Sequence, residues 1–100
     1  VEEGARLREL GVPAVLLFGV PDDSRKDPTG KEAWAGDGLV QLALRALREK
    51  VPELVLFADA CFCEYTDHGH CGVLNADREV RNDATLEALG RVAVAARETR

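Results

Sequence analysis

The chain has 100 residues, of which 46% are hydrophobic and 31% are charged, and its formal net charge is −5. This composition is typical of globular proteins and excludes a disordered chain, and no apolar run approaches the ~18 residues of a transmembrane helix. Its 13 basic residues are scattered through an acidic sequence, which argues against a protein that binds nucleic-acid backbones. The sequence contains no Met and opens directly in a helical pattern, so we expect a piece of a longer protein.

The first half of the chain predicts a helix, a strand, a loop and a second helix. Residues 1–10 have helical spacing, and a Gly and a Pro follow them. Residues 14–19 form an unbroken apolar run, which is typical of a strand buried on both faces. Residues 20–36 are rich in Asp, Pro and Gly and predict a polar loop. Residues 37–50 carry one apolar face, and we expect Asp37 to cap the N-terminus of this helix.

The second half predicts a strand, a long loop and a third helix. Residues 54–59 are again continuously apolar and close on a carboxylate, and residues 60–81 are mostly polar. A third helix is expected to start at Asn82 or Asp83. Its apolar side chains are Leu86, Leu89, Val92, Val94 and Ala96.

Strands that alternate with helices predict a parallel sheet joined by right-handed crossovers. Two strands alone cannot be buried on both faces, so the missing neighbours must come from more chain or from another subunit. The carboxyl ends of parallel strands form the working edge of such folds, and here they are Gly19 and Asp59. The two longest loops leave from this edge, so we expect function there.

Three cysteines, Cys61, Cys63 and Cys71, lie within the second loop. Residues i and i+2 of an extended backbone point the same way, so the first two thiols can face one point. Gly69 and Gly72 allow the chain to turn back and bring the third thiol to them. Clustered thiols in odd number favour a metal site in a reducing compartment over a disulfide framework, and thiolates favour zinc over magnesium or calcium.

Several interpretations of this loop stay open from spacing alone. Three ligands and a water would make a catalytic zinc, whereas His68 or His70 as a fourth ligand would make a structural one. The thiols can also be core residues, or a redox pair formed by Cys61 and Cys63. Asp59 ends a buried strand, where a carboxylate is costly unless it is used or paired, so we expect it to be functional.

Four other features have plain structural interpretations. Glu64 and Tyr65 are expected to be structural or to satisfy the loop. Trp34 is expected to pack under the first loop, and residues 22–27 are expected to form a solvated loop.

The segment DACFCEYTDHGHCGVL at residues 59–74 resembles the metal-binding signature of the porphobilinogen synthase (5-aminolevulinate dehydratase) family. The resemblance covers nearly the whole chain, and the signature is highly specific. Further matches are LFGV at 17–20, TG at 29–30, AW at 33–34, DGLV at 37–40 and NDATLE at 82–87.

The resemblance implies a (β/α)₈ barrel of about 250 residues. Residues 1–100 would then be an internal section of one barrel domain, with two to three βα units and parallel strands. The implied enzyme is a lyase that condenses two molecules of 5-aminolevulinate to porphobilinogen in tetrapyrrole (haem) synthesis. The resemblance makes Cys61, Cys63 and Cys71 the ligands of an active-site Zn²⁺ and places Asp59 beside the zinc and the substrate amine. In some members the histidine matching His70 is linked to a second metal position.

The family's chemistry also needs two lysines that form Schiff bases with the substrate carbonyls. Lys26, Lys31 and Lys50 are the lysines of this chain, and none follows a buried strand. We therefore expect the 100 residues alone to be inactive. The resemblance further implies a cytoplasmic homo-octamer whose partner is the small-molecule substrate, with no nucleic acid and no membrane. The alternative is a small non-catalytic α/β module with a structural zinc, and a third possibility is a thiol redox protein.

Overall fold

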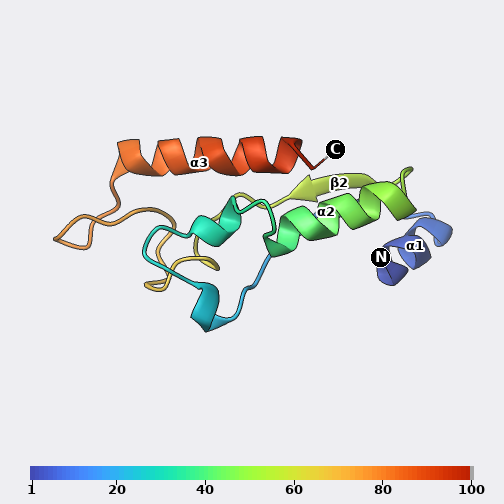
Figure 1. The fold of residues 1–100 in the computed structure, drawn as a ribbon. Coiled ribbons are helices and arrows are strands. Elements are labelled where there is room, and N and C mark those ends of the chain that lie inside the picture. The colour runs from blue at the N-terminus through green and yellow to red at the C-terminus, as the bar shows by residue number, and fades with distance from the viewer. Residues whose placement is uncertain (100) are drawn as a thin grey trace.

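The computed structural model describes residues 1–99, and within them it places three α-helices, two short 3₁₀ helices and one two-stranded sheet (Figure 1). The molecule is elongated, with extents of 50 × 23 × 21 Å. None of the helices in this range is both long enough and apolar enough to cross a membrane. The elements in chain order are α1 (Glu2–Glu9), β1 (Ala14–Leu17), η1 (Asp23–Arg25), η2 (Lys31–Ala33), α2 (Leu39–Lys50), β2 (Val55–Ala58) and α3 (Asn82–Arg97).

The two strands are parallel, as the alternation of strands and helices predicts. Their register pairs Ala14 with Val55 and Leu17 with Ala58, and α2 forms the crossover between them. One face of the sheet packs on the helices, because alternate strand residues project to the same side. This sheet cluster contains buried Leu47, Val51 and Leu54 with partly buried Ala5, Val15, Leu17 and Leu56 against them.

The opposite face of the sheet is open, as expected of two strands that lack the neighbours needed to bury both faces. Leu16, Phe18, Val55 and Phe57 are each more than half exposed. They alternate with the residues that face the helices, so they form one continuous apolar face. The physical reason is that two strands with helices on one side leave the other side without a covering layer.

The start of α2 differs from its sequence-based prediction. The helix begins at Leu39 with Gly38 as its cap residue, and Asp37 makes no capping hydrogen bond. A Cβ at position 38 would lie 2.7 Å from the carbonyl oxygen of Glu32. The close approach of the preceding loop therefore fixes where the helix starts, and the cap position falls on Gly38, directly after the predicted Asp37.

Helix α3 starts at Asn82 as expected but buries fewer of its apolar side chains. Ala88 and Val92 are buried against Ala33, Phe62 and Tyr65 of the two loops, and Trp34 packs on the same cluster. This loop cluster confirms that Trp34 is a packing residue. Leu86, Leu89 and Val94 are exposed, because only one side of α3 meets the rest of the chain.

Candidate metal centre

The site begins where the strands end. The N–H of Asp59 donates to the carbonyl oxygen of Leu17 at 3.0 Å, so the strand ladder continues one residue beyond β2. Continued alternation places Asp59 on the open face of the sheet, in line with Val55 and Phe57. The two loops that follow β1 and β2 meet just beyond this edge, which confirms that both leave from the carboxyl ends of the strands.

The three cysteine thiols converge on one point. The Sγ of Cys61 lies 3.3 Å from the Sγ of Cys63 and 3.3 Å from that of Cys71. All three Sγ atoms lie within 4.8 Å of one another. Thiolates at 2.3 Å from one tetrahedral ion would be about 3.8 Å apart, so small side-chain shifts are enough to fit a metal. The three residues therefore form a group that can hold a metal ion.

Hydrogen bonds inside the loop bring the distant third thiol back to the other two. The hydroxyl of Thr66, which is 2% exposed, donates to the carbonyl oxygen of His70 at 2.8 Å. The N–H of Phe62 lies 3.4 Å from the Sγ of Cys71 and points toward it. Just after Cys71, the N–H of Val73 donates to the hydroxyl of Thr85 on α3. Cys71 is thus tied both to the start of its own loop and to α3.

The thiol loop is also anchored on the first loop. The N–H of Asp27 donates to the carbonyl oxygen of Tyr65 at 3.4 Å, and the N–H of Asp67 donates to that of Asp27 at 3.1 Å. The Asp27 carboxylate accepts from Thr29 and from the N–H of Lys31. Partial burial acts to raise the pKa of Asp27, but these hydrogen bonds outweigh it and lower the pKa below its usual value.

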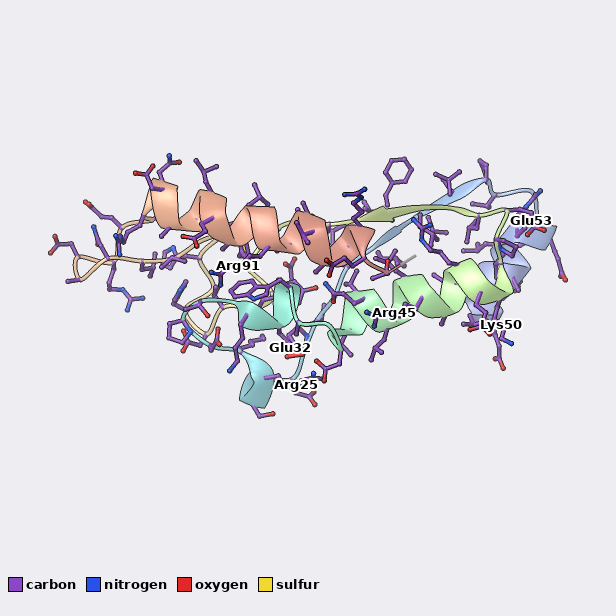
Figure 2. The ribbon with its side chains drawn as sticks, turned by 45° about the horizontal axis from the view of Figure 1, so that its top comes forward. Arg25, Glu32, Arg45, Lys50, Glu53 and Arg91 are labelled. Atoms are coloured by element: carbon purple, nitrogen blue, oxygen red, sulfur yellow. The ribbon has the colours of Figure 1, made fainter. Side chains whose placement is uncertain are left out.

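Residues 22–25 are exposed, as expected of a solvated loop, but the first loop is also ordered by side-chain contacts. Arg25 pairs with Glu32, which is 8% exposed, and Figure 2 shows these two side chains directed toward each other from η1 and η2. Sequence reasoning missed this ordered first loop. The available signal was the Asp-Pro-Thr-Gly sequence at 27–30, which is typical of a turn closed by an aspartate side chain.

Tyr65 has the structural role expected of it. Its ring is buried in the loop cluster, and its hydroxyl lies against the backbone of Gly19 at the end of β1. A Cβ at position 19 would overlap that hydroxyl, so this site requires a glycine. Burial raises the pKa of Tyr65 above its usual value.

The two histidines do not join the thiols. His68 accepts at Nδ1 from the N–H of His70 at 3.1 Å, and its Nε2 lies 3.1 Å from the carbonyl oxygen of Pro28, to which it can donate. Both ring nitrogens of His68 are thereby engaged in the neutral tautomer. Within residues 1–99 the thiol group contains Cys61, Cys63 and Cys71 and no imidazole.

Cys61 and Cys63 differ in acidity. The backbone N–H of Cys63, followed by the thiols of Cys71 and Cys63, stabilises the charged form of Cys61 and lowers its pKa. Hydrogen bonding to Cys61, together with burial, raises the pKa of Cys63 to about 11. Metal ligation requires thiolates, so a bound dication would have to displace the proton of Cys63.

A second group of donors overlaps the first. Carboxylate oxygens of Asp59 and Glu64 and the Sγ of Cys61 also lie within 4.8 Å of one another. The Oε2 of Glu64 is buried and has no hydrogen-bond partner among the described residues. Its sequence neighbours gave no signal of this burial.

The lysines stand away from the strand ends, as the sequence predicts. Lys26 lies 3.0 Å from an oxygen of Asp23, and Lys31 lies 3.8 Å from Asp27. Lys50 is at the end of α2, at the opposite end of the molecule from the loops (Figure 2). Its amine is also paired, at 3.9 Å from Glu49.

Comparison with known proteins shows where this arrangement belongs. The family model described as delta-aminolevulinic acid dehydratase matches residues 1–99. The enzyme of that name from Synechococcus elongatus is 50% identical over 97 residues, which are 94% of this chain and 29% of the relative. The one from Escherichia coli is 48% identical over 91 residues, which are 91% of this chain and 27% of the relative.

A solved structure shares the fold. It is the delta-aminolevulinic acid dehydratase (porphobilinogen synthase) of Toxoplasma gondii in complex with the reaction product porphobilinogen, with a TM-score of 0.93 and 31% identity. The match covers 98% of this chain and 28% of that one. It confirms the expected fold class, an α/β section of a (β/α)₈ barrel with parallel strands. The chain spans less than a third of its relatives' length, and it belongs to the delta-aminolevulinic acid dehydratase family, which is the porphobilinogen synthase family that its cysteine segment resembles.

Proposed function

We propose that this chain supplies the metal-binding half of the active site of an enzyme that condenses two molecules of 5-aminolevulinate to porphobilinogen and two waters. The observation that carries the proposal is the convergence of three thiols beyond the end of β2, in a chain that matches this family from residue 1 to 99. The product named in the Toxoplasma gondii structure supports the same substrate class.

Zn²⁺ is the metal we propose for Cys61, Cys63 and Cys71. Thiolates are soft donors, and three of them leave one position of a tetrahedral ion for water or substrate. When bound there, zinc would supply Lewis-acid chemistry, which polarises a carbonyl or holds an amine. The engaged ring of His68 supports this open three-thiol set over a structural site closed by that histidine.

In this proposal Asp59 places the amine of one substrate molecule. Its carboxylate lies on the open face of the sheet, next to the thiols, and can accept hydrogen bonds from an ammonium or amine group. No lysine of the described chain lies at a strand end, so the two amines that form Schiff bases would come from other strands of the barrel. Residues 1–100 would then be an internal section of one barrel domain, inactive alone, within a cytoplasmic homo-octamer.

The test uses a full-length enzyme that carries this chain. Changing Cys71→Ala should lower zinc affinity by at least about a hundredfold and abolish porphobilinogen formation, because it removes one of three metal ligands. Zinc is measured by atomic emission and product by its colour reaction. Asp59→Asn should instead keep zinc and lose activity. Zinc content and activity that persist in Cys71→Ala would refute the proposal.

A further inference from the structure

The segment that follows Cys71 is bound to the start of α3. The carbonyl oxygen of Val73 accepts from the N–H of Arg81 at 2.7 Å, and the N–H of Val73 donates to the hydroxyl oxygen of Thr85 at 3.1 Å. Both backbone groups of Val73, two positions after the third thiol, are thus held by α3 and its cap residue Arg81. The second of these bonds is made by a side chain, so a substitution can remove it.

The hydroxyl of Thr85 is itself fixed on the helix. It donates to the carbonyl oxygen of Arg81 at 2.6 Å, a bond to the preceding turn that limits the rotation of a threonine side chain. A threonine hydroxyl has one proton to donate and two lone pairs that accept. With its proton engaged by Arg81, the oxygen acts as the acceptor for the N–H of Val73.

The chain between Cys71 and Val73 lies directly against this hydroxyl. Gly72 is buried, and a Cβ at its position would lie 2.7 Å from the Oγ1 of Thr85 and 2.8 Å from a methyl carbon of Val80. No side chain fits in that space, so the backbone approaches α3 as closely as a glycine allows. Cys71 is one residue from this contact, and its backbone position therefore depends on Thr85.

Two hydroxyls hold Cys71, one on each side of it along the chain. On the N-terminal side, Thr66 donates to the carbonyl oxygen of His70 from within the thiol loop. On the C-terminal side, the bond from Val73 goes to Thr85, which belongs to a helix outside the loop. The third thiol thus takes part of its position from α3.

We propose that Thr85 is a positioning residue for the metal site, because its hydroxyl fixes Val73 and thereby keeps the sulfur of Cys71 beside the other two thiols. The inference rests on the proposed zinc site at Cys61, Cys63 and Cys71. In this role Thr85 binds neither metal nor substrate and acts through Cys71. Removing a group that orients a metal ligand lowers metal affinity by about ten- to a hundredfold.

The test uses the full-length enzyme that carries this chain, freed of metal under reducing conditions. Zinc affinity is measured by competition with a chelating dye, and Co²⁺ in place of zinc reports its sulfur ligands through charge-transfer and ligand-field absorption. Thr85→Val keeps the shape and removes the hydroxyl, so it should weaken zinc about tenfold and alter the Co²⁺ spectrum. Thr85→Ser keeps the hydroxyl and should recover the spectrum and a zinc affinity within about threefold of the unmodified enzyme.

Thr99→Val is the matched control at the other end of α3. The hydroxyl of Thr99 also donates to a carbonyl oxygen of the preceding turn, that of Ala96, at 2.7 Å. This variant should keep both the zinc affinity and the Co²⁺ spectrum of the unmodified enzyme. If Thr85→Val does not fold, Thr85→Ala replaces it with the same expected zinc loss, because water can then reach the freed N–H of Val73.

The inference is overturned if removal of the Thr85 hydroxyl leaves zinc affinity unchanged, if Thr99→Val loses zinc equally, or if Thr85→Ser does not recover it. The unmodified enzyme separates this failure from that of the proposed function. Sulfur-to-cobalt absorption there, with no change in Thr85→Val, removes the positioning role alone. Absence of that absorption in the unmodified enzyme refutes the three-thiol site, and the positioning role with it.

Discussion

The sheet end of the molecule and its loop end are ordered by different interactions. Around the sheet, apolar side chains of α2 and β2 pack together, with Leu47, Val51 and Leu54 at the centre of the sheet cluster. Around the thiols, the contacts include backbone and hydroxyl hydrogen bonds, such as those of Asp27 and Thr66, beside the smaller loop cluster.

This difference between the two ends shows which part of the structure is held by its own contacts and which part needs a further layer. The sheet exposes one apolar face and so depends on a covering layer, whereas the thiol loop closes on itself and on its neighbour. Apolar packing tolerates exchange of one hydrocarbon for another, but a hydrogen bond fixes two atoms to within a few tenths of an ångström. A metal site needs ligands that hydrogen bonds hold in fixed positions, and such hydrogen bonds are found beside the cysteines.

The largest effect is expected from Leu47→Ala. It removes a side chain that is 6% exposed at the centre of the sheet cluster, and we expect it to lower the free energy of unfolding by about 2–5 kcal/mol. Zinc affinity of the folded protein should change by less than about threefold, because the thiol loop is tied by its own hydrogen bonds. Denaturant titration and zinc competition measure the two quantities.

Leu42→Ala is the matched control on the same helix, since Leu42 is 51% exposed and should lose less than about 1 kcal/mol. A Leu47→Ala protein that remains folded but has lost its zinc would contradict the separation of the two regions.

Thr66→Val is expected to lower the free energy of unfolding less than Leu47→Ala does, but to lower the affinity for zinc more. The change keeps the shape and removes the hydroxyl that donates to His70, at a cost of about 1–3 kcal/mol. Because that bond draws Cys71 toward Cys63, zinc affinity should fall about tenfold.

Thr99→Val provides the comparison for this variant. The hydroxyl of Thr99 is equally buried and donates to the carbonyl oxygen of Ala96 at 2.7 Å, at the far end of α3. It should destabilise by a similar amount and leave zinc affinity unchanged. Equal zinc losses in the two variants would show that general destabilisation, rather than loop closure, governs the site.

The smallest expected effect is a pH dependence at Tyr65, which is the only tyrosine of the chain. Burial raises its pKa in the folded state, so the folded protein holds the phenolic proton more tightly than the unfolded chain. The resulting stability is fully present below the unfolded pKa of about 10 and is lost as the pH rises through the folded value. Tyrosinate absorbance near about 295 nm should therefore titrate above pH ~10 while the protein stays folded, and a midpoint at or below ~10 would place the ring in solvent.

The elements and the thiol cluster could be predicted because their signals are local. Apolar runs mark the two strands, helical spacing marks α1, α2 and α3, and alternation across one residue brings Cys61 and Cys63 together. The return of Cys71 was predicted from glycines, and the structure adds the hydroxyls that fix it.

The parts that could not be predicted depend on residues far apart in sequence. The contact of Asp27 with the thiol loop joins positions about 40 residues apart, and Asp37 loses its capping role to the approach of Glu32 behind Gly38. The exposure of Leu86 and Val94 likewise depends on which neighbours cover α3. Local sequence patterns carry no information on contacts between residues that lie far apart in the sequence.

The parallel bridge between Asp27 and Thr66 repeats, outside the sheet, the side-by-side order of β1 and β2. The first loop therefore supplies the backbone groups with which the thiol loop pairs, although it contributes no sulfur. Substitutions at Gly19 and Asp27 should therefore weaken binding of the metal proposed for the thiols, although neither residue would be a ligand.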